Sequence, residues 1–264
     1  MYKFPFGQEV HKLVQQDRSP KKVFVLGVYA SAVHAKWKDK NGKRVCQALA
    51  VASEPRIFWD GNEKEAAEII SKIHIPEEFG SLEPAASNLN GPSAKVLDEN
   101  VLAPLGFTRN DAWLCDLLPE YRLSPGQVEA IEKHYAPICN GDDWRKTIVP
   151  KPPKKFCDQK RREEILAELD ESQAELLILL GDDPLDDFFK HIAGVKYDTL
   201  QKCVDENGYG KAIEASINGR KINVLPLTHP HQIGAMGNHS SKWHQAHQDW
   251  EQQMRNNPNY YLEK

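Results

Sequence analysis

The sequence lacks the patterns that mark disulfide-linked, metal-binding and membrane proteins. Its five cysteines are odd in number, lie far apart and form no CxxC pair. This predicts neither a disulfide framework nor a zinc or iron–sulfur site. The longest aliphatic run, Leu176–Leu180, is far too short to cross a bilayer, and the first residues have no apolar signal-peptide region. We therefore expect a cytoplasmic protein with reduced thiols, no bound metal and no contact with a membrane.

Strong charge and recognisable cofactor motifs are also missing. The 264 residues carry a net charge of −4, so nothing draws the whole chain toward nucleic acid. Neither GxGxxG nor a P-loop is present, and we expect no cofactor. Without an internal repeat, a low-complexity segment or a dividing linker, the sequence predicts one domain over residues 1–264, in which residues 1–20 form an N-terminal arm.

Four stretches of the chain each join an apolar run to a polar loop. Continuous apolar runs that end in Gly, Pro or Asp are typical of strands buried on both faces of a sheet. If the four strands are neighbours, their loops converge on one crevice at the carboxyl ends of the strands, where α/β proteins bind ligands. The α/β class follows from four stretches: Val23–His34, Ala112–Arg122, Leu176–Phe188 and Val224–Trp243.

Turn and capping signals indicate the connections between these strands. Asn41-Gly42 predicts a hairpin turn into residues 45–51, and Asn218-Gly219 predicts a type I′ hairpin within residues 211–227. A capping box is expected at Ser124-Pro-Gly-Gln127, where a helix begins. The charged residues 160–171 predict a helix with a solvated exterior.

The last of the four stretches contains Thr228-His229-Pro230-His231, directly after an apolar strand. In the functional interpretation, His229 donates a hydrogen bond to an oxygen that gains charge in a transition state, a contribution that is often large. In the structural interpretation, it is a loop histidine whose ring is satisfied by the backbone. The motif fits both.

Asp116 follows the apolar run Ala112–Cys115 at the mouth of the expected crevice. It can read the edge of a bound base or act as a general base, but on the motif alone an aspartate that caps a helix or turn is the better interpretation. We assign Asp182 and Asp183 to capping, because Pro184 directly after them indicates a helix start.

Small residues and the last helix offer further contacts. The loop Gly27–Ser31 can approach a ligand with its backbone, and Tyr29 either stacks on a planar ligand or covers the sheet end. Ser240 and Lys242, at a helix start, suit an anion such as phosphate. His244 and His247 share one helix face; a metal site with His231 is conceivable, but a solvated face is the better interpretation.

Taken in order, these stretches resemble the uracil-DNA glycosylase superfamily over residues 23–250. The segments that carry the resemblance are Gly27–Ser31 (the water-activating loop), Ala48–Val51 (the base-stacking strand), Gly91–Ser93 (the proline–serine phosphate clamp), Asp116 (the asparagine that reads the uracil edge), Leu176–Gly181 (the third strand), His229-Pro230 (the HPS loop) and His239–Lys242 (the helix start that binds DNA phosphate).

The resemblance implies a three-layer α/β/α sandwich around a central, mostly parallel four-stranded sheet, in a protein that flips a damaged base into a pocket. It implies that His229 stabilises the departing base anion and that Asp116 orients the base or the water. The implied base pocket consists of Gly27, Tyr29, Ala30, Ser31, Val51 and His231. The implied phosphate contacts are Ser93, Ser240 and Lys242.

Four positions depart from the family pattern. Tyr29 stands where the family often has an acid or amide, and its ordinary pKa of about 10 prevents it from serving as a carboxylate base. Val51 replaces an aromatic platform, and His231 replaces the family serine. Asp116 replaces asparagine, and an ionised carboxylate only accepts hydrogen bonds. We therefore hypothesise that Asp116 selects a base edge that presents donors, such as the N1–H and N2–H₂ of guanine.

Together these features lead us to expect a divergent, monomeric superfamily member that hydrolyses the N-glycosidic bond of a damaged or deaminated base in DNA. The alternative is a member that binds a nucleotide or nucleic acid without glycosylase activity, which the departures and the net charge favour. A third alternative is a small-molecule α/β enzyme with a different sheet order.

Overall fold

The computed structural model describes residues 1–236, 240–257 and 261, and the chain forms two compact units. The first unit comprises residues 1–13, 29–92 and 119–154, and the second comprises residues 14–28, 93–118 and 155–264. Neither unit is a continuous stretch of sequence. The prediction of a single domain stays a prediction. No helix among the described residues is long and apolar enough to span a membrane.

The second unit contains a five-stranded sheet and most of the helices. Its elements are β1 (Val23–Tyr29), α2 (Pro92–Val96), η4 (Leu97–Leu102), η5 (Ala103–Leu105), η6 (Arg109–Asp111), β5 (Ala112–Leu118), α5 (Gln159–Ser172), β6 (Leu176–Leu180), α6 (Asp182–Asp187), η9 (Phe189–His191), α7 (Leu200–Asn207), β7 (Ile213–Ile217), β8 (Arg220–Leu227), α8 (Pro230–Ile233) and α9 (Ser241–Asn256).

The four predicted strands lie side by side in this sheet, whose order is β5-β1-β6-β8-β7. β1 pairs with β6 in parallel, β6 pairs with β8 in parallel, and β7 pairs with β8 in antiparallel fashion. The predicted α/β class with a mostly parallel sheet is therefore confirmed. The sheet has five strands rather than the predicted four, because the first arm of the predicted hairpin adds an antiparallel edge strand to β8.

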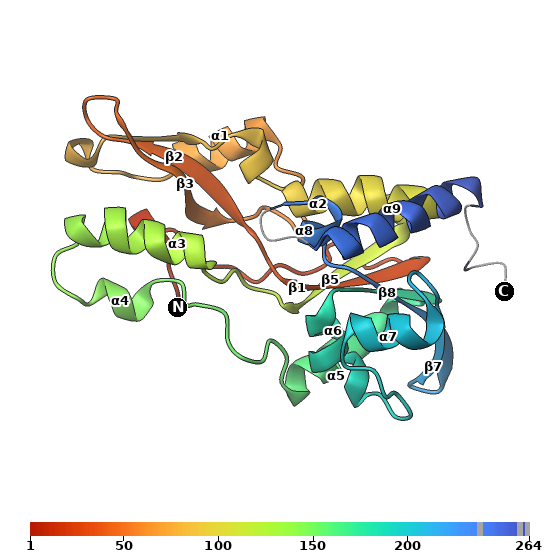
Figure 1. The fold of residues 1–264 in the computed structure, drawn as a ribbon. Helices are drawn as coiled ribbons and strands as arrows, with labels where there is room; N and C mark the ends of the chain where they lie inside the picture. The colour runs from red at the N-terminus through yellow and green to blue at the C-terminus, as the bar shows by residue number, and fades with distance from the viewer. Residues whose placement is uncertain (237–239, 258–260, 262–264) are drawn as a thin grey trace. The chain divides into compact units, whose positions relative to one another are not determined.

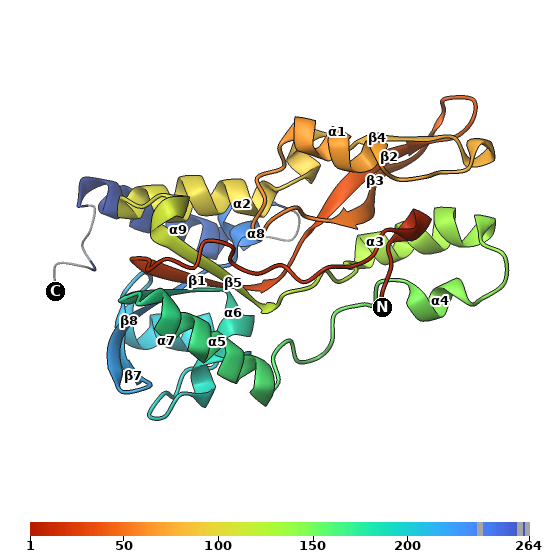
Figure 2. The same cartoon turned by 180° about the vertical axis from the view of Figure 1, so that it is seen from behind.

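Both faces of the sheet are covered by helices. Figures 1 and 2 show α2, α8 and α9 on one face, and α5, α6 and α7 on the other. The residues of β6 are fully buried, as a continuous aliphatic run predicts for a central parallel strand. Alternate side chains of β1 and β5, such as Phe24, Leu26 and Trp113, pack with Ile165 of α5 and Phe188 in one apolar cluster.

The hairpin between β7 and β8 has the predicted turn. Asn218 and Gly219 both have positive φ, at 49° and 78°, which is the combination that a type I′ turn requires. The strands pair from Ile217 with Arg220 to Ile213 with Val224. The sequence prediction for this hairpin is confirmed, and the turn sets the register of the strand that leads to His229.

The first unit is built on an antiparallel sheet with the order β3-β2-β4. Its elements are η1 (Pro5–Gly7), β2 (Ala32–Lys38), β3 (Arg44–Ser53), α1 (Glu63–Ser71), η2 (Glu77–Phe79), β4 (Ser81–Pro84), η3 (Ser87–Leu89), α3 (Pro125–Ala130), η7 (Ile131–Tyr135), η8 (Ala136–Ile138) and α4 (Trp144–Thr147). The hairpin predicted at Asn41-Gly42 joins β2 to β3 and is confirmed.

The loop predicted after the apolar run of the stretch Val23–His34 is wrong for most of its length. β1 continues to Tyr29 and β2 begins at Ala32, so that two residues lie between the strands. β2 pairs with both β3 and β4, and its side chains Ala35 and Trp37 are buried in the apolar cluster of the first unit. The small residues of this segment are typical of a loop, but pairing with a strand on each side holds it in an extended conformation.

The first part of the predicted N-terminal arm packs into the first unit. Phe4 is 1% exposed and stacks on Tyr121 at 5.5 Å between ring centroids. The N–H of Leu13 donates to the carbonyl of Pro119 at 2.7 Å. Through the buried residues Phe4, Pro5 and Leu13, this segment packs against the first unit, while most of its other residues stay exposed or half-buried.

The predicted capping box at Ser124 is half correct. The hydroxyl of Ser124 accepts a hydrogen bond from the N–H of Gln127 at 3.4 Å, so the serine caps α3 as predicted. The Gln127 side chain does not return to Ser124. It accepts from the N–H of Ala50 and donates to the carbonyl of Ala48, both at 2.8 Å, and so binds α3 to β3.

Candidate functional site

Several predicted site residues of the second unit lie within or just after the strands of its sheet. Gly27 lies within β1, Asp116 lies within β5, and His229 comes two residues after the end of β8. β1, β6 and β8 are parallel neighbours, so their carboxyl ends meet at one edge of the sheet. This edge is where α/β proteins bind ligands most often.

The His229 imidazole is held in one defined state. Its Nδ1 atom accepts a hydrogen bond from the backbone N–H of His231 at 3.2 Å, which caps the short helix α8. The proton of the neutral ring is therefore on Nε2. Burial lowers the pKa of His229 to about 4, and the neighbouring ring of His231 acts in the same direction. At neutral pH, His229 is thus an uncharged ring that presents an Nε2–H donor.

Gly181, at the exit of β6, lies directly against His229, and the sequence analysis did not identify it as a site residue. A Cβ atom at Gly181 would stand 3.2 Å from the Cβ of His229, and the φ angle of +96° disfavours any side chain there. Its N–H donates to the carbonyl of Leu227 at 2.8 Å. The glycine therefore permits the close approach of the chain after β6 to the chain after β8. Its position directly after the apolar run Leu176–Leu180 is the feature of the sequence that could have identified it as a site residue.

The Asp116 side chain is 3% exposed. Its neighbours Cys115 and Leu117 belong to the cluster on the α5 side of the sheet, so Asp116 faces the other side. Among the described residues, none contributes a hydrogen bond to the shift of its pKa. Burial raises the pKa of this group to about 7, and the positive charge of Arg161 opposes the shift. Asp116 is therefore not a capping aspartate.

Two strands separate Asp116 from His229 in the sheet. Because β1 and β6 lie between β5 and β8, three strand spacings of about 4.8 Å place the two strand axes about 14 Å apart. The two side chains do not pair with each other. If both side chains contact the same ligand, they contact different parts of its surface.

Arg161 of α5 holds the end of β5, and the prediction of a solvated exterior for this helix is wrong at this residue. Its guanidinium donates to the carbonyls of Asp116 at 2.8 Å and Leu117 at 3.2 Å, and it binds Glu168 at 3.1 Å. The Arg161 side chain is 12% exposed. The apolar residues Ile165 and Leu169, four positions apart, mark the buried face of α5, and this spacing was the signal in the sequence.

His247 is also buried rather than solvated as predicted. It is fully buried and bonds the hydroxyl of Tyr209 and the carbonyl of Asn100, at 2.7 Å and 2.8 Å. His244 lies 2.7 Å, through Nδ1, from the carbonyl of Ile233. No group of three or more possible metal ligands occurs in the described part of the chain. The helix turns this histidine face toward the protein because α9 packs on α8 and η5.

The remaining residues of the implied base pocket are divided between the two units: Tyr29, Ala30, Ser31 and Val51 belong to the first, and His231 belongs to the second. Tyr29 is half-buried at the end of β1, Ala30 is buried, and Ser31 is half-buried before β2. Val51 of β3 is fully buried in the apolar cluster of the first unit. His231 is exposed on α8, with its ring 5.3 Å from that of His229. Their role in binding stays a prediction.

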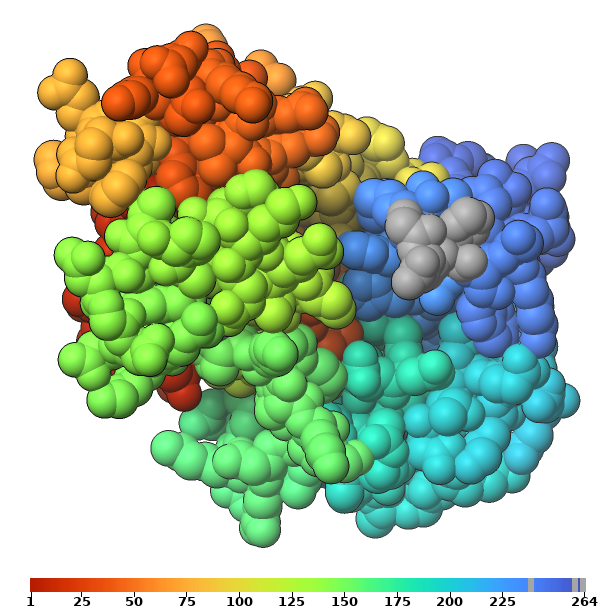
Figure 3. Space-filling view, turned by 60° about the vertical axis from the view of Figure 1, so that its left-hand side comes forward, coloured from red at the N-terminus to blue at the C-terminus, as the bar shows by residue number. Residues whose placement is uncertain are grey.

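The implied phosphate contacts already have partners within the second unit, with the exception of Ser93. The hydroxyl of Ser240 caps α9 by accepting from the N–H of Trp243 at 3.4 Å. Lys242 bonds Gln201 at 2.6 Å and lies over the Trp243 ring. Ser93 is half-buried in α2. His239, also part of the resemblance, lies outside the described residues. Figure 3 shows residues of α8 and α9, in blue, at the surface of this unit.

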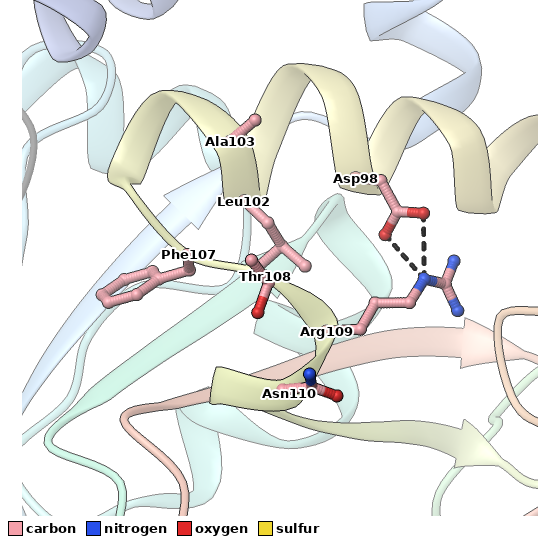
Figure 4. A pocket seen from close by; sticks show the side chains of 7 residues that line it. All are labelled: Asp98, Leu102, Ala103, Phe107, Thr108, Arg109 and Asn110. Carbon is pink, nitrogen blue, oxygen red and sulfur yellow. Dashed lines mark hydrogen bonds and ion pairs between the residues drawn. The ribbon is translucent and has the colours of Figure 1, made fainter.

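A hollow of about 400 Å³ lies elsewhere in the second unit, next to η5 and η6 (Figure 4). It is lined by Asp98, Leu102, Ala103, Phe107, Thr108, Arg109 and Asn110. The Arg109 guanidinium is paired with Asp98 at 2.7 Å. None of the predicted site residues lines this hollow, and its charged groups are neutralised by each other, so it is not the site that the sequence indicates.

Neither a protein-family model nor a curated protein matches the chain. The functional argument therefore depends on the geometry of the site residues.

Proposed function

We propose that this chain is a divergent member of the uracil-DNA glycosylase superfamily that hydrolyses the N-glycosidic bond of a damaged or deaminated base in DNA. The observation that carries the proposal is the state of His229. An uncharged imidazole with its proton on Nε2, at the carboxyl edge of a mostly parallel sheet, is a hydrogen-bond donor at the place where α/β proteins bind ligands.

The proposed reaction uses this donor at the departing base. The bond between the sugar C1′ atom and the base nitrogen breaks, and its electron pair leaves with the base. Water adds to C1′, and the proton that it loses neutralises the base. The Nε2–H of His229 donates to the base carbonyl that gains charge. A neutral imidazole does this without first losing a proton, as in enzymes that polarise a carbonyl with an uncharged histidine.

Asp116 contributes to the proposed site by orienting the base or the water. A carboxyl group this deeply buried, to whose pKa none of the described residues contributes a hydrogen bond, lacks the partners that normally offset the free-energy cost of burying a charge. A ligand that supplies those partners is bound selectively. The helices on both faces of the sheet support the three-layer arrangement that the resemblance implies.

The alternative function is binding of a nucleotide or nucleic acid without cleavage. Two observations favour it. Tyr29 stands where a water-activating acid is expected, and a tyrosine hydroxyl is not a carboxylate base. Lys242, an implied phosphate contact, already bonds Gln201. This alternative keeps His229 and Asp116 as contacts to a base and dispenses with the attacking water.

The test is a glycosylase panel on single- and double-stranded oligonucleotides that contain uracil, hypoxanthine, xanthine or alkylated bases. We expect wild type to cleave one class and His229→Ala to be about 100- to 1,000-fold slower, the usual loss when one oxyanion donor is removed. His191→Ala, which changes an exposed histidine of the same unit, is the matched control and is expected to retain full activity.

Two outcomes contradict the glycosylase proposal. One is a folded wild-type protein that cleaves none of these oligonucleotides; nucleotide titrations would then test the binding alternative. The other is cleavage that His229→Ala leaves unchanged, which would separate the activity from the site described here.

A further inference from the structure

A chain of hydrogen bonds in the second unit ends at the residue before His229. The backbone N–H of Thr228 donates to the hydroxyl oxygen of Tyr209 at 3.2 Å. The same hydroxyl lies 2.7 Å from Nδ1 of His247. The Nε2 atom of His247 lies 2.8 Å from the carbonyl oxygen of Asn100. Tyr209 and His247 therefore connect η4 and α9 to Thr228, the first residue of the segment between β8 and α8 (the His229 loop).

The direction of every hydrogen bond in this chain is determined. A carbonyl oxygen only accepts, so the His247 proton is on Nε2 and Nδ1 must accept from the Tyr209 hydroxyl. That leaves the Tyr209 oxygen free to accept from Thr228. Burial lowers the pKa of His247 to about 4 and raises the pKa of Tyr209. At neutral pH both groups keep the protonation states that the chain requires.

Close packing holds the two side chains in place. His247 is fully buried, and its ring lies 4.9 Å from that of Trp250 on the same helix. A Cβ atom at Gly210 would stand 2.0 Å from the Trp250 ring, so the backbone next to Tyr209 lies directly on α9. Trp250 in turn donates to the hydroxyl of Tyr261 at 3.0 Å. The Tyr209 hydroxyl therefore has little freedom to move away from Thr228.

We propose that Tyr209 and His247 are positioning residues that fix the backbone at Thr228 and thereby hold the His229 imidazole with its Nε2–H directed at the ligand. The inference rests on the proposed role of His229. Thr228 is held by Tyr209, and the Cβ of His229 lies against Gly181. The ring itself is held by the N–H of His231. Without the Tyr209 hydroxyl, one of these three constraints on His229 is removed.

The experiment compares Tyr209→Phe with Tyr197→Phe. Tyr197 is a matched control because it is also buried in the second unit, and its hydroxyl bonds Glu206 at 2.9 Å and Asn207 at 3.1 Å rather than Thr228. The readout is the ¹⁵N NMR signals of the His229 imidazole, which report its tautomer and surroundings and do not require any activity. We expect Tyr209→Phe to shift these signals and to populate the Nδ1–H tautomer, while Tyr197→Phe leaves them unchanged.

A second pair of variants keeps the test valid if Tyr209→Phe folds poorly. Glutamine can donate to Asn100 and accept from Tyr209, whereas leucine can do neither. We expect His247→Gln to retain the wild-type His229 signals and His247→Leu to shift them. On a substrate found in the glycosylase panel, we expect Tyr209→Phe to lower kcat about tenfold with little change in KM.

The inference is overturned if Tyr209→Phe leaves the His229 signals as in wild type, or if Tyr197→Phe shifts them equally. Because these signals are measured without substrate, a protein that cleaves no oligonucleotide still decides the question. Shifted signals in an inactive protein would contradict the proposed function and leave the positioning role intact.

Discussion

At the scale of single residues, the site depends on two ionisable groups whose charged forms are disfavoured for the same physical reason. Removal from water disfavours the charged form, which lowers the pKa of a histidine and raises that of an aspartate. His229 has a pKa of about 4 and Asp116 a pKa of about 7. Each group can then act as a hydrogen-bond donor near neutral pH. A protonated Asp116 would present one donor and one acceptor, as an asparagine does.

The pKa of Asp116 gives a prediction about stability. The folded-state pKa of about 7 exceeds the ordinary 3.8, so protonation of Asp116 favours the folded state. Its contribution to the free energy of unfolding is fully present below pH 3.8 and is lost as the pH rises through 7. Asp116→Asn removes this pH-dependent loss of stability, because an amide does not ionise. We expect its advantage over wild type in the free energy of unfolding to grow by about 3 kcal/mol between pH 5 and pH 8.

Urea unfolding at several pH values measures this difference. Asp249→Asn, at an exposed site on α9, is the control and is expected to give a pH-independent difference. If the Asp116→Asn advantage does not change with pH, the carboxyl group is ionised throughout. An ionised carboxylate only accepts hydrogen bonds, so this result would support the hypothesis that Asp116 selects a base edge that presents donors. It would speak against a protonated Asp116 that presents one donor and one acceptor, as an asparagine does.

At the scale of elements, side chains from neighbouring helices fix the strand ends that carry the site. Arg161 of α5 binds the last carbonyls of β5, and Tyr209, just after α7, binds the N–H that follows β8. Both groups satisfy backbone atoms at points where the β-ladder stops. A backbone group left unpaired in the interior is costly, so such contacts determine where the chain leaves the sheet.

Arg161→Met tests this role at β5. The variant removes the donor that Arg161 supplies to the carbonyls of Asp116 and Leu117. It also removes the charged partner of the buried Glu168, whose carboxylate retains the hydrogen bond from the Trp113 indole at 3.1 Å. We expect a loss of about 3 kcal/mol in the free energy of unfolding, typical of breaking a buried ion pair. Lys160→Met, an exposed change on the same helix, is expected to cost under about 0.5 kcal/mol.

Urea unfolding of the two variants gives the comparison. Equal midpoints for Arg161→Met and Lys160→Met would show that the guanidinium contacts contribute nothing measurable to stability.

At the scale of the whole molecule, the chain alternates between two units, each made of three separate segments. Residues 14–28 and 93–118 bring β1 and β5 into the second unit from between segments of the first. A unit assembled from distant segments completes its core only when those segments are all in place. This arrangement couples the folding of the two units through the chain itself.

We therefore expect thermal unfolding to occur in a single transition, with equal calorimetric and van't Hoff enthalpies. Differential scanning calorimetry measures both. Two resolved transitions, or a calorimetric enthalpy well above the van't Hoff value, would contradict the prediction of one domain and would show that the units unfold independently.

The sequence by itself determined the features that depend on local chemistry. Apolar runs predicted β1, β5, β6 and β8, and Asn218-Gly219 predicted its turn, because burial on both faces and positive φ each demand particular residue types. The position of His229 after a buried strand followed from the same patterns.

Only the tertiary structure decided what depends on distant partners. The pairing of β2 on both edges converted a predicted loop into a strand, and packing against β5 and Tyr209 buried Arg161 and His247. These residue types are ordinarily solvated, so their own chemistry predicts exposure. The protonation states of His229 and Asp116 likewise arise from burial by other segments, which local sequence does not encode.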